Sequence, residues 1–598
     1  MKQIKRLTLG FLLTFMAITT WGAKAISTPI QVLQTDGTTL VIYLHGDENF
    51  SWTTTADGVL LAQVGKSYYI ASVSPDGSLV ATSQLAHNAD MRSAAETKLA
   101  KKQDKRTFFR YATKSKPQTR ISIGTDSPAF FPHSGTPKAL VLLVEFTDVK
   151  FKSSDPKATF EYYLNSKPGD AVPAGNDINQ SRNHGSVAQY FKDMSNGAFI
   201  PQFDLFGPFT MPETSVYYGK GRNDQHYNEM IAKACELADA AGVDFSQYDQ
   251  NGDGDVDLVY IIYAGYGASV SGDEDDLWPK SGPGSFGTYD GVNVRRFGIN
   301  NELNYKEGKI FGSGPQHRIN GIGLFCHEFS HTMGLPDLYP TDPSAQLDNQ
   351  AMEYWDLMDG GEYVDNGYTP TPYTPWEMEV MGWLNLTELN ADGHYSLLPF
   401  NQERKAYKIE SGLAGNSEYL ILQNIQNNGW WGKLLGHGML IYRIDYPEPV
   451  VSMGDYPNNI AGKPGVTLVA ADGLVITSYR VYDPKTGPTE ANPYSRSEYN
   501  QSHYGDPYPG NSNVTRIDNI KLNGGIMRKP IYNITETSGT IAFDFRTTPQ
   551  PTSIFGIETK SQIKDEKIYT LDGQYVGTNL TNLPKGIYIY QHKKYVVE

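Results

Sequence analysis

The chain has 598 residues, too many for a single hydrophobic core, so several domains are expected. Its formal net charge of −15 argues against nucleic acid as a partner, because nucleic acid is bound by basic surfaces. Only two cysteines occur, Cys235 and Cys326, so no disulfide framework is expected.

The first 25 residues have the pattern of a secretory signal peptide. Three basic residues lie within the first six, residues 7–21 are mostly apolar, and Ala23 and Ala25 offer a small-x-small cleavage site. A retained membrane anchor is the alternative, but polar sequence follows at once. No later apolar run approaches the length that spans a bilayer. We therefore expect residues 1–25 to be removed and the rest to be exported, to the medium or the cell surface.

Residues 26–120 are expected to form a separate, small α+β module. Residues 39–44 and 68–71 are predicted strands punctuated by Asp-Gly turns, and the sequence becomes helix-prone and basic after residue 88. A folded module with an exposed basic linker is typical of a cleavable propeptide, and a permanent accessory domain is the alternative. Since the module lacks cysteine, the candidates for blocking a metal are His45, Asp47 and His87.

Residues 121–385 show the alternation of strands and helices that is typical of an α/β domain. The short apolar runs at 139–146 and 258–263 predict central strands, because they are too short for helices and uniformly apolar. Ser186 is expected to begin a helix, and residues 223–241 predict an amphipathic helix.

A loop rich in oxygen side chains lies before the second of these strands. Oxygen side chains alternate with other residues, and Gly254 stands at the sixth position, as in the first half of an EF-hand calcium loop. The twelfth position is Tyr260 instead of glutamate, and an ordinary Asx-rich turn is the alternative. The predicted ligands of a structural calcium ion are Asp249, Asn251, Asp253, Asp255 and Asp257.

The motif H-E-x-x-H begins at His327. Four residues turn an α-helix through about 400°, so His327 and His331 leave the same face and can hold a zinc ion. Glu328 can then take a proton from a water on that ion. A buried helix with two structural histidines is the alternative. Together with the preceding strands and helices, the motif predicts a zincin-type, metzincin-like α/β fold.

The chain is expected to turn back after His331. Gly334 can end the helix in the left-handed conformation, and Pro336 prevents the helix from resuming. Asp337 is the first carboxylate that could return to the metal as a third ligand, which leaves a fourth position for water. The rival carboxylates are Glu353, Asp356 and Asp359.

Further side chains near the motif have predicted roles. A tight turn at 349–361 is expected to place Met358 beneath the metal ligands, where a thioether packs without competing for zinc. Tyr354 and Tyr363 are the candidates for stabilising an oxyanion. Cys326 should point about 100° away from His327 on the helix, so we expect a buried, inert thiol.

The rest of the chain is predicted to be β-rich. Residues 374–383 should form a last helix, and residues 386–546 a β-sandwich-like domain with strands near 419–423, 438–442, 466–469 and 541–545. Residues 547–598 are expected to form a linker and a small β module, either a sorting signal or an end-cap.

Residues 26–545 resemble the immune-inhibitor-A-like metallopeptidases. The resemblance is carried by H-E-x-x-H-x-x-G-x-x-D-L-Y from His327, L-L-V-E-F at 142–146, D-G-D-V-D at 253–257, Y-A-G-Y-G, L-W-P and W-D-L-M. It implies a secreted endopeptidase made as a zymogen, with zinc at His327 and His331, Glu328 as base, and calcium dependence. The strings at 569–574 and 583–589 resemble the sorting module of the type IX secretion route of Bacteroidetes.

These observations predict a secreted zinc endopeptidase that hydrolyses extracellular proteins and peptides and that is inhibited by its own propeptide. A non-catalytic surface adhesin on the same fold is one alternative, disfavoured because Glu328 is intact and structural zinc sites usually have four protein ligands. A zinc amidase is the other.

Overall fold

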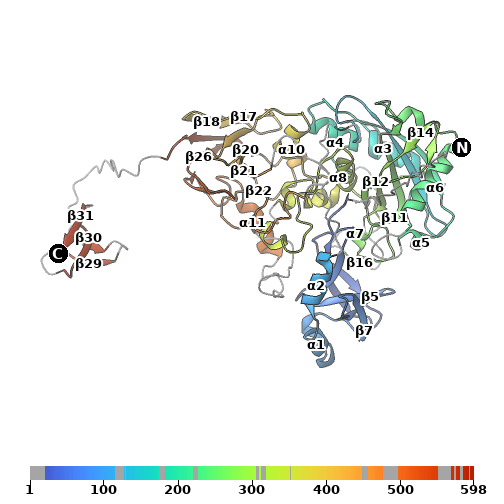
Figure 1. Ribbon diagram of the computed structural model, residues 1–598, viewed down its shortest axis with the longest axis horizontal. Helices are drawn as coiled ribbons and strands as arrows, with labels where there is room; N and C mark the ends of the chain where they lie inside the picture. Colours follow the sequence, from blue (N-terminus) through green and yellow to red (C-terminus); the bar gives the residue numbers. More distant parts are fainter. Residues whose placement is uncertain are drawn as a thin grey trace, which may run out of the picture. The chain divides into compact units, whose positions relative to one another are not determined.

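The computed structural model divides into two compact units, Met1–Thr548 and Pro549–Glu598 (Figure 1). The predicted apolar run of the signal peptide, up to residue 20, and the basic linker at 115–126 lie outside the described residues. The structure describes residues 21–114, 127, 130–173, 182–219, 226–304, 309–310, 318–349, 352–446, 456–475, 496–549, 568–570, 574–578, 583–590 and 593–597.

A six-stranded sheet of order β1-β12-β15-β11-β8-β9 is the centre of the first unit. Four strands are parallel, and they include the two predicted central strands: β8 (Lys138–Glu145), β9 (Gln202–Thr210), β11 (Val259–Tyr266) and β15 (Arg296–Leu303). Strand β12 (Lys280–Pro283) runs antiparallel to β15, and β1 (Trp21–Gly22) runs antiparallel to β12.

This sheet separates two hydrophobic cores, because successive side chains of a strand point to opposite faces. Val141 and Leu143 of β8 lie in the first core, and Leu140 and Leu142 lie in the second. The first core is shared with helices α3 (Pro156–Asn165), α4 (Val187–Met194) and α8 (Ile322–Thr332), and the second with α6 (Tyr227–Ala240). The predicted helix starts at Ser186, whose side chain caps α4.

The predicted propeptide contributes six strands to an antiparallel sheet of seven. Strand β16 comes from residues 121–385 and pairs with β2, so this α/β region and the predicted propeptide share the sheet. Its strands are β16 (Lys309–Ile310), β2 (Ile30–Leu33), β3 (Thr39–Gly46), β4 (Ser51–Thr55), β5 (Leu60–Val64), β6 (Ser67–Val73) and β7 (Leu79–Leu85), followed by helices α1 (Ala94–Ala100) and α2 (Lys105–Lys114).

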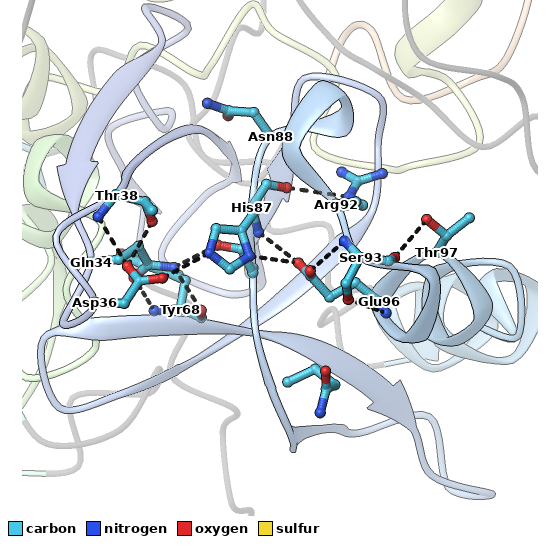
Figure 2. Close-up of polar contacts among 12 residues, drawn as sticks. Gln34, Asp36, Thr38, Tyr68, His87, Asn88, Arg92, Ser93, Glu96 and Thr97 are labelled. Atoms are coloured by element: carbon cyan, nitrogen blue, oxygen red, sulfur yellow. Dashed lines mark hydrogen bonds and ion pairs between the residues drawn. The ribbon is translucent and has the colours of Figure 1, made fainter.

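His87 ties this sheet to helix α1 (Figure 2). Its Nε2 lies 2.9 Å from Asp36 Oδ2 in the turn between β2 and β3, and its Nδ1 lies 2.9 Å from Glu96 Oε1. Glu96 also completes a capping box with Ser93 at the start of α1. Burial lowers the pKa of His87, but hydrogen bonds to Asp36 and Glu96 outweigh this and raise it. His87 therefore stabilises the module itself.

The predicted β-rich region consists of two main sheets that share one hydrophobic core. Leu420 and Ile441 of one sheet and Ile531 and Phe543 of the other lie in the same cluster of buried residues. The first sheet contains β17 (Thr387–Glu388), β19 (Tyr407–Glu410), β20 (Tyr419–Ile425), β21 (Gly438–Ile444) and β22 (Val466–Leu468), and the second contains β18 (Gly393–Leu397), β27 (Thr540–Phe545), β26 (Ile531–Thr537) and β23 (Arg516–Ile517).

Shorter elements complete the first unit. The predicted closing helix is α10 (Pro375–Val380), and Thr374 caps it in a second capping box. The others are α5 (Ser215–Gly219), α7 (Ala268–Ser271), α9 (Gln346–Asn349), α11 (Arg496–Gly505), β10 (Asp255–Val256), β13 (Thr288–Tyr289), β14 (Val292–Val294), β24 (Ile520–Lys521) and β25 (Ile526–Met527).

The second unit is a small antiparallel sheet of order β29-β28-β30-β31. Its strands are β28 (Ile568–Thr570), β29 (Tyr575–Gly577), β30 (Gly586–Tyr590) and β31 (Lys593–Val597). Within the part of the chain that the structure describes, no helix has both the length and the apolar character needed to cross a membrane.

Candidate active site

The H-E-x-x-H motif lies on α8, in which every residue is buried. Two glycines let another segment approach the start of this helix closely. A Cβ on Gly321 would lie 2.1 Å from the carbonyl carbon of Gly367, and one on Gly323 would lie 2.1 Å from the backbone oxygen of Glu362. The segment Gly360–Gly367 therefore packs directly on the helix and carries Glu362 and Tyr363 towards the motif.

The bend after the helix forms as predicted. Helix α8 ends at Thr332, and Gly334 has a φ of 99°, in the left-handed region that glycine adopts without strain. The backbone N–H of Gly334 donates to the carbonyl of His331 at 2.9 Å. After this turn the chain brings Asp337 back to the two histidines.

Three donor atoms converge at the bend. The Nε2 atoms of His327 and His331 are 3.2 Å apart, and Asp337 Oδ1 lies 3.3 Å and 3.2 Å from them. Ligands placed tetrahedrally about 2.05 Å from a zinc ion are about 3.3 Å apart, so this triangle fits one face of a zinc site. Among the described residues, this is the one group of three or more His, Cys, Asp or Glu side chains with metal-site spacing.

Backbone carbonyls set the orientation of both imidazoles. His327 Nδ1 lies 2.9 Å from the carbonyl of Leu357, and His331 Nδ1 lies 2.8 Å from the carbonyl of Leu335. A carbonyl can only accept, so each Nδ1 carries a proton and each Nε2 is left to bind a metal. Leu357 precedes Met358, whose carbonyl accepts from Leu338 N–H at 2.8 Å. The predicted methionine turn thus contacts the motif, while the placement of the Met358 thioether beneath the metal stays a prediction.

The charges around the three donors favour a cation. Burial lowers the pKa of His327, but the carboxylates of Glu362 and Asp337 raise it to about 10. Burial raises the pKa of Glu328, and the positive charge at His327 and His331 offsets part of that rise and leaves it at about 7. A divalent cation can replace the proton that these carboxylates otherwise hold at the histidines.

The rival carboxylates of the third position have other partners. Lys24 Nζ lies 3.3 Å from Glu353 Oε2 and 3.0 Å from Asp359 Oδ1. Asp356 Oδ1 accepts the N–H of Met358 at 2.6 Å. Asp337 is therefore the carboxylate that completes the donor set.

The N-terminal segment 21–26 runs across this site. Strand β1 pairs with the edge strand β12, with Gly22 opposite Lys280. The N–H of Ala23 donates to Glu328 Oε1 at 2.7 Å, which places a peptide group directly against the predicted base. No pattern in the sequence predicts this contact, because residues 1–25 have the composition of a signal peptide.

Side chains bind the same segment. Tyr339 donates its hydroxyl to the carbonyl of Gly22 at 2.7 Å, and Trp278 Nε1 donates to the carbonyl of Ala23 at 2.9 Å. The Gly22–Ala23 peptide bond is thus held at its oxygen by Tyr339 and at its nitrogen by Glu328. Tyr339 follows Asp337 by two residues, and this proximity was the one available signal for its role.

The two tyrosines predicted as oxyanion stabilisers have different partners. The hydroxyl of Tyr363 donates to the carbonyl of Lys24 at 2.6 Å, and that of Tyr354 lies 3.3 Å from Ser27 Oγ. Both hydroxyls contact the N-terminal segment, but their hydrogen bonds go to Lys24 and Ser27 and not to the carbonyl of Gly22. Tyr339 takes that position instead.

The residues predicted to block the metal from the propeptide are engaged within the module. His45 Nε2 lies 2.9 Å from Thr54 Oγ1, and the imidazole stacks on Trp52. Asp47 accepts backbone N–H groups of its own turn, and His87 binds Asp36 and Glu96. Blocking by these three side chains is therefore wrong for this structure.

Several carboxylate oxygens of the predicted calcium loop accept hydrogen bonds from within the loop, whereas the buried Asp257 Oδ1 has no hydrogen-bond partner among the described residues. Asp249 Oδ1 accepts the N–H groups of Gly252 and Asp253, and Asp249 Oδ2 accepts that of Gly254. Asp257 Oδ2 accepts from Gln250. These bonds are those of an Asx-rich turn, so the arrangement does not support calcium, and a calcium ion here stays a prediction.

Cys326 lies beside the motif and is a free, buried thiol. Burial raises its pKa well above the usual value, so it is protonated and unreactive. The prediction of an inert thiol is confirmed.

Comparison with known proteins agrees with this geometry. Residues 132–384 match the family model of the immune inhibitor A peptidase M6 catalytic domain. This M6 region contains the three donors, Glu328 and Tyr339, and the match supports the resemblance to immune-inhibitor-A-like metallopeptidases.

Three curated relatives are similar over parts of their length. Immune inhibitor A of Bacillus thuringiensis subsp. alesti is 27% identical over 42% of this chain, and pre-pro-metalloprotease PrtV of Vibrio cholerae is 23% identical over 43%. A putative secreted metallopeptidase of Arthroderma benhamiae is 25% identical over 33%. The matches span 41%, 31% and 31% of these relatives, which is less than half of each. Their names and the M6 region support a metalloprotease.

The donor set predicts which carboxylate holds zinc. Asp337→Asn should lower zinc affinity, because it removes a charged donor that would bind the metal directly. Loss of a residue that only hydrogen-bonds to a ligand costs ~10–100-fold in affinity, so the loss here should be at least that large. Glu353→Gln is the matched control and should keep its zinc. Metal content after dialysis against a zinc buffer, measured by mass spectrometry, checks both. Zinc loss from the control alone would show that the third ligand is misassigned.

Proposed function

We propose that the chain is a secreted, zinc-dependent endopeptidase made as a zymogen. The observation that carries this proposal is the triangle of donors at His327, His331 and Asp337 next to a carboxylate that contacts a backbone amide. The similarity to the M6 catalytic domain supports the same reaction class.

A zinc ion held by His327, His331 and Asp337 would supply Lewis acidity, which activates water and polarises the scissile carbonyl. Glu328 serves as the proton carrier. Burial raises the pKa of Glu328, which helps the carboxylate to take a proton from water and then give it to the leaving amine. The contact of 2.7 Å between Oε1 and the nitrogen of Ala23 is within range for that second transfer.

Tyr339 serves as the donor to the developing oxyanion. Its hydroxyl already binds the carbonyl oxygen of Gly22, the atom that gains negative charge when the carbon becomes tetrahedral. Strand β12 supplies the backbone pairing that holds the substrate extended, as it holds β1. Trp278 and Tyr363 fix the next two carbonyls.

The N-terminal region serves as the inhibitor. Residues 21–24 occupy the positions that a substrate backbone requires, so the two exclude each other. This inhibition acts while residues 21–24 are still attached, so it ends if residues 1–25 are removed as the predicted signal peptide. The module behind them is attached to the M6 region: Ile26 N–H donates to the carbonyl of Ser269, and Tyr68 donates to the carbonyl of Gly272. These contacts keep the segment at the site until the chain is processed.

The role of Glu328 predicts loss of activity without loss of metal. Glu328→Ala should lower casein cleavage by ~10²–10⁴-fold, the usual contribution of a general acid–base, and should retain zinc. Casein zymography with and without a chelator, together with metal analysis, provides the measurement. Undiminished cleavage by this variant would refute the mechanism, and activity that survives zinc removal would refute the metal's part in it.

The position of Tyr339 predicts a defect in kcat. Tyr339→Phe should lower kcat by ~10²–10³-fold with little change in KM, because the lost hydrogen bond strengthens as the oxyanion forms. Tyr354→Phe is the control, since that hydroxyl contacts Ser27 instead of the Gly22 carbonyl. Steady-state kinetics on a quenched peptide separates the two. A larger kcat defect in Tyr354→Phe would reassign the donor.

Zymogen control predicts activation by processing. Removal of residues up to about Arg120 from the full chain, which still carries Gly22 and Ala23, should raise the rate of casein cleavage, because Glu328 and Tyr339 lose their contacts with these two residues. The rate is compared before and after limited proteolysis, with the cut located by mass spectrometry. Equal rates would show that the segment does not inhibit.

A further inference from the structure

Within the N-terminal segment 21–26, the side chain of Lys24 binds two buried carboxylates of the M6 region. Its ammonium lies 3.3 Å from Glu353 Oε2 and 3.0 Å from Asp359 Oδ1. The side chains of Lys24, Glu353 and Asp359 are only 4%, 2% and 0% exposed. Glu353, Asp359 and Tyr499 are together called the acidic site below.

The acidic site is held in place by its own hydrogen bonds. Tyr499 donates its hydroxyl to Glu353 Oε2 at 2.9 Å, and the N–H of Glu353 donates to Asp359 Oδ2 at 2.8 Å. The second bond requires Glu353 to adopt a φ of 46°, in the left-handed region where a side chain is strained. Besides Lys24, the carboxylates are therefore positioned by contacts within the M6 region and with α11.

Two buried carboxylates side by side need a cation. Burial raises the pKa of Asp359 to about 6 even though Lys24 lowers it, and Glu353 raises it further. Burial lowers the pKa of Lys24, but Asp359 and Glu353 outweigh this and raise it, so the lysine stays charged. A neutral side chain in its place would remove the ion pair from two carboxylates that lie away from water, which is unfavourable.

The backbone contacts of the segment show how far Lys24 lies from the peptide bond at the reacting position. Glu328 binds the nitrogen of Ala23, and Tyr339 binds the carbonyl of Gly22, so the bond at the reacting position joins residues 22 and 23. Lys24 is then the second residue on the C-terminal side of that bond. Its carbonyl is held by Tyr363, which fixes the direction of the chain at this point.

We infer that the acidic site is a substrate-binding subsite that selects a lysine or arginine two residues after the cleaved bond, with Lys24 as its internal mimic. This inference rests on the proposed peptidase function. It makes Glu353 and Asp359 specificity-determining residues, and Tyr499 the residue that positions Glu353.

A series of synthetic peptides tests the subsite. The peptides differ only at the second position after the cleaved bond, which carries Lys, Arg, Met, Gln or Glu, and they are digested by the active, zinc-loaded protein. We expect kcat/KM for the Lys and Arg peptides to exceed that for Met by ~10–100-fold, the usual worth of a buried charge-assisted hydrogen bond. Met matches Lys in length but carries no charge, and Glu should be the poorest substrate.

Variants assign the preference to the acidic site. The double variant Glu353→Gln, Asp359→Asn should bring the Lys-to-Met ratio close to one. Tyr499→Phe should lower the same ratio less, because both carboxylates remain. Zinc content and thermal unfolding show whether each variant is folded, and the wild-type peptide series stands as a test if the double variant is not.

The outcomes separate the two proposals. If no peptide and no casein is cleaved, the proposed peptidase function fails. If peptides are cleaved but Lys and Met are equivalent at the second position, the function stands and the subsite is refuted. A basic preference at a different position, or one that survives in the folded double variant, also overturns the subsite.

Discussion

Three lone pairs that face one another inside the protein are the constraint on which the site depends. Nε2 of His327, Nε2 of His331 and Oδ1 of Asp337 lie within 3.3 Å of one another, an arrangement that is unfavourable without positive charge between them. The helix period sets the two histidines, and the left-handed Gly334 returns the aspartate. The carbonyls of Leu335 and Leu357 hold both imidazoles with Nε2 inward. The sheet and the first core serve to keep this geometry fixed.

The edge of the central sheet connects that constraint to the substrate. Strand β12 offers backbone hydrogen bonds that any extended peptide can use, so pairing alone gives no selectivity. Glu328 binds the nitrogen and Tyr339 binds the carbonyl oxygen of one peptide group, and these two contacts define which bond reacts. The acidic site lies further along the same chain and depends on side-chain charge. The choice of the bond that is cleaved and the preference for a particular side chain thus depend on different residues.

Features set by neighbouring residues could be predicted from the sequence, and features set by distant contacts could not. The helix, its end at Gly334 and the return of Asp337 all arise within the sixteen residues from Ile322 to Asp337, from periodicity and glycine conformation. The bond from Ala23 to Glu328 spans 305 positions, and that from Lys24 to Asp359 spans 335. No local pattern marks such partners, so the sequence predicts Glu353 and Asp359 only as rival carboxylates for the metal. The calcium pattern is local, but its carboxylates bind backbone amides of their own loop, so the structure does not support the ion and calcium stays a prediction.

The most direct test of the account is X-ray absorption at the zinc edge of the purified protein, with metal content measured in parallel. The account predicts one zinc per chain, bound by two imidazoles and by oxygen at about 2.0–2.2 Å, with no sulfur. A sulfur neighbour at about 2.3 Å would contradict the donor set. A zinc-free protein that still cleaves peptides would contradict the account as a whole.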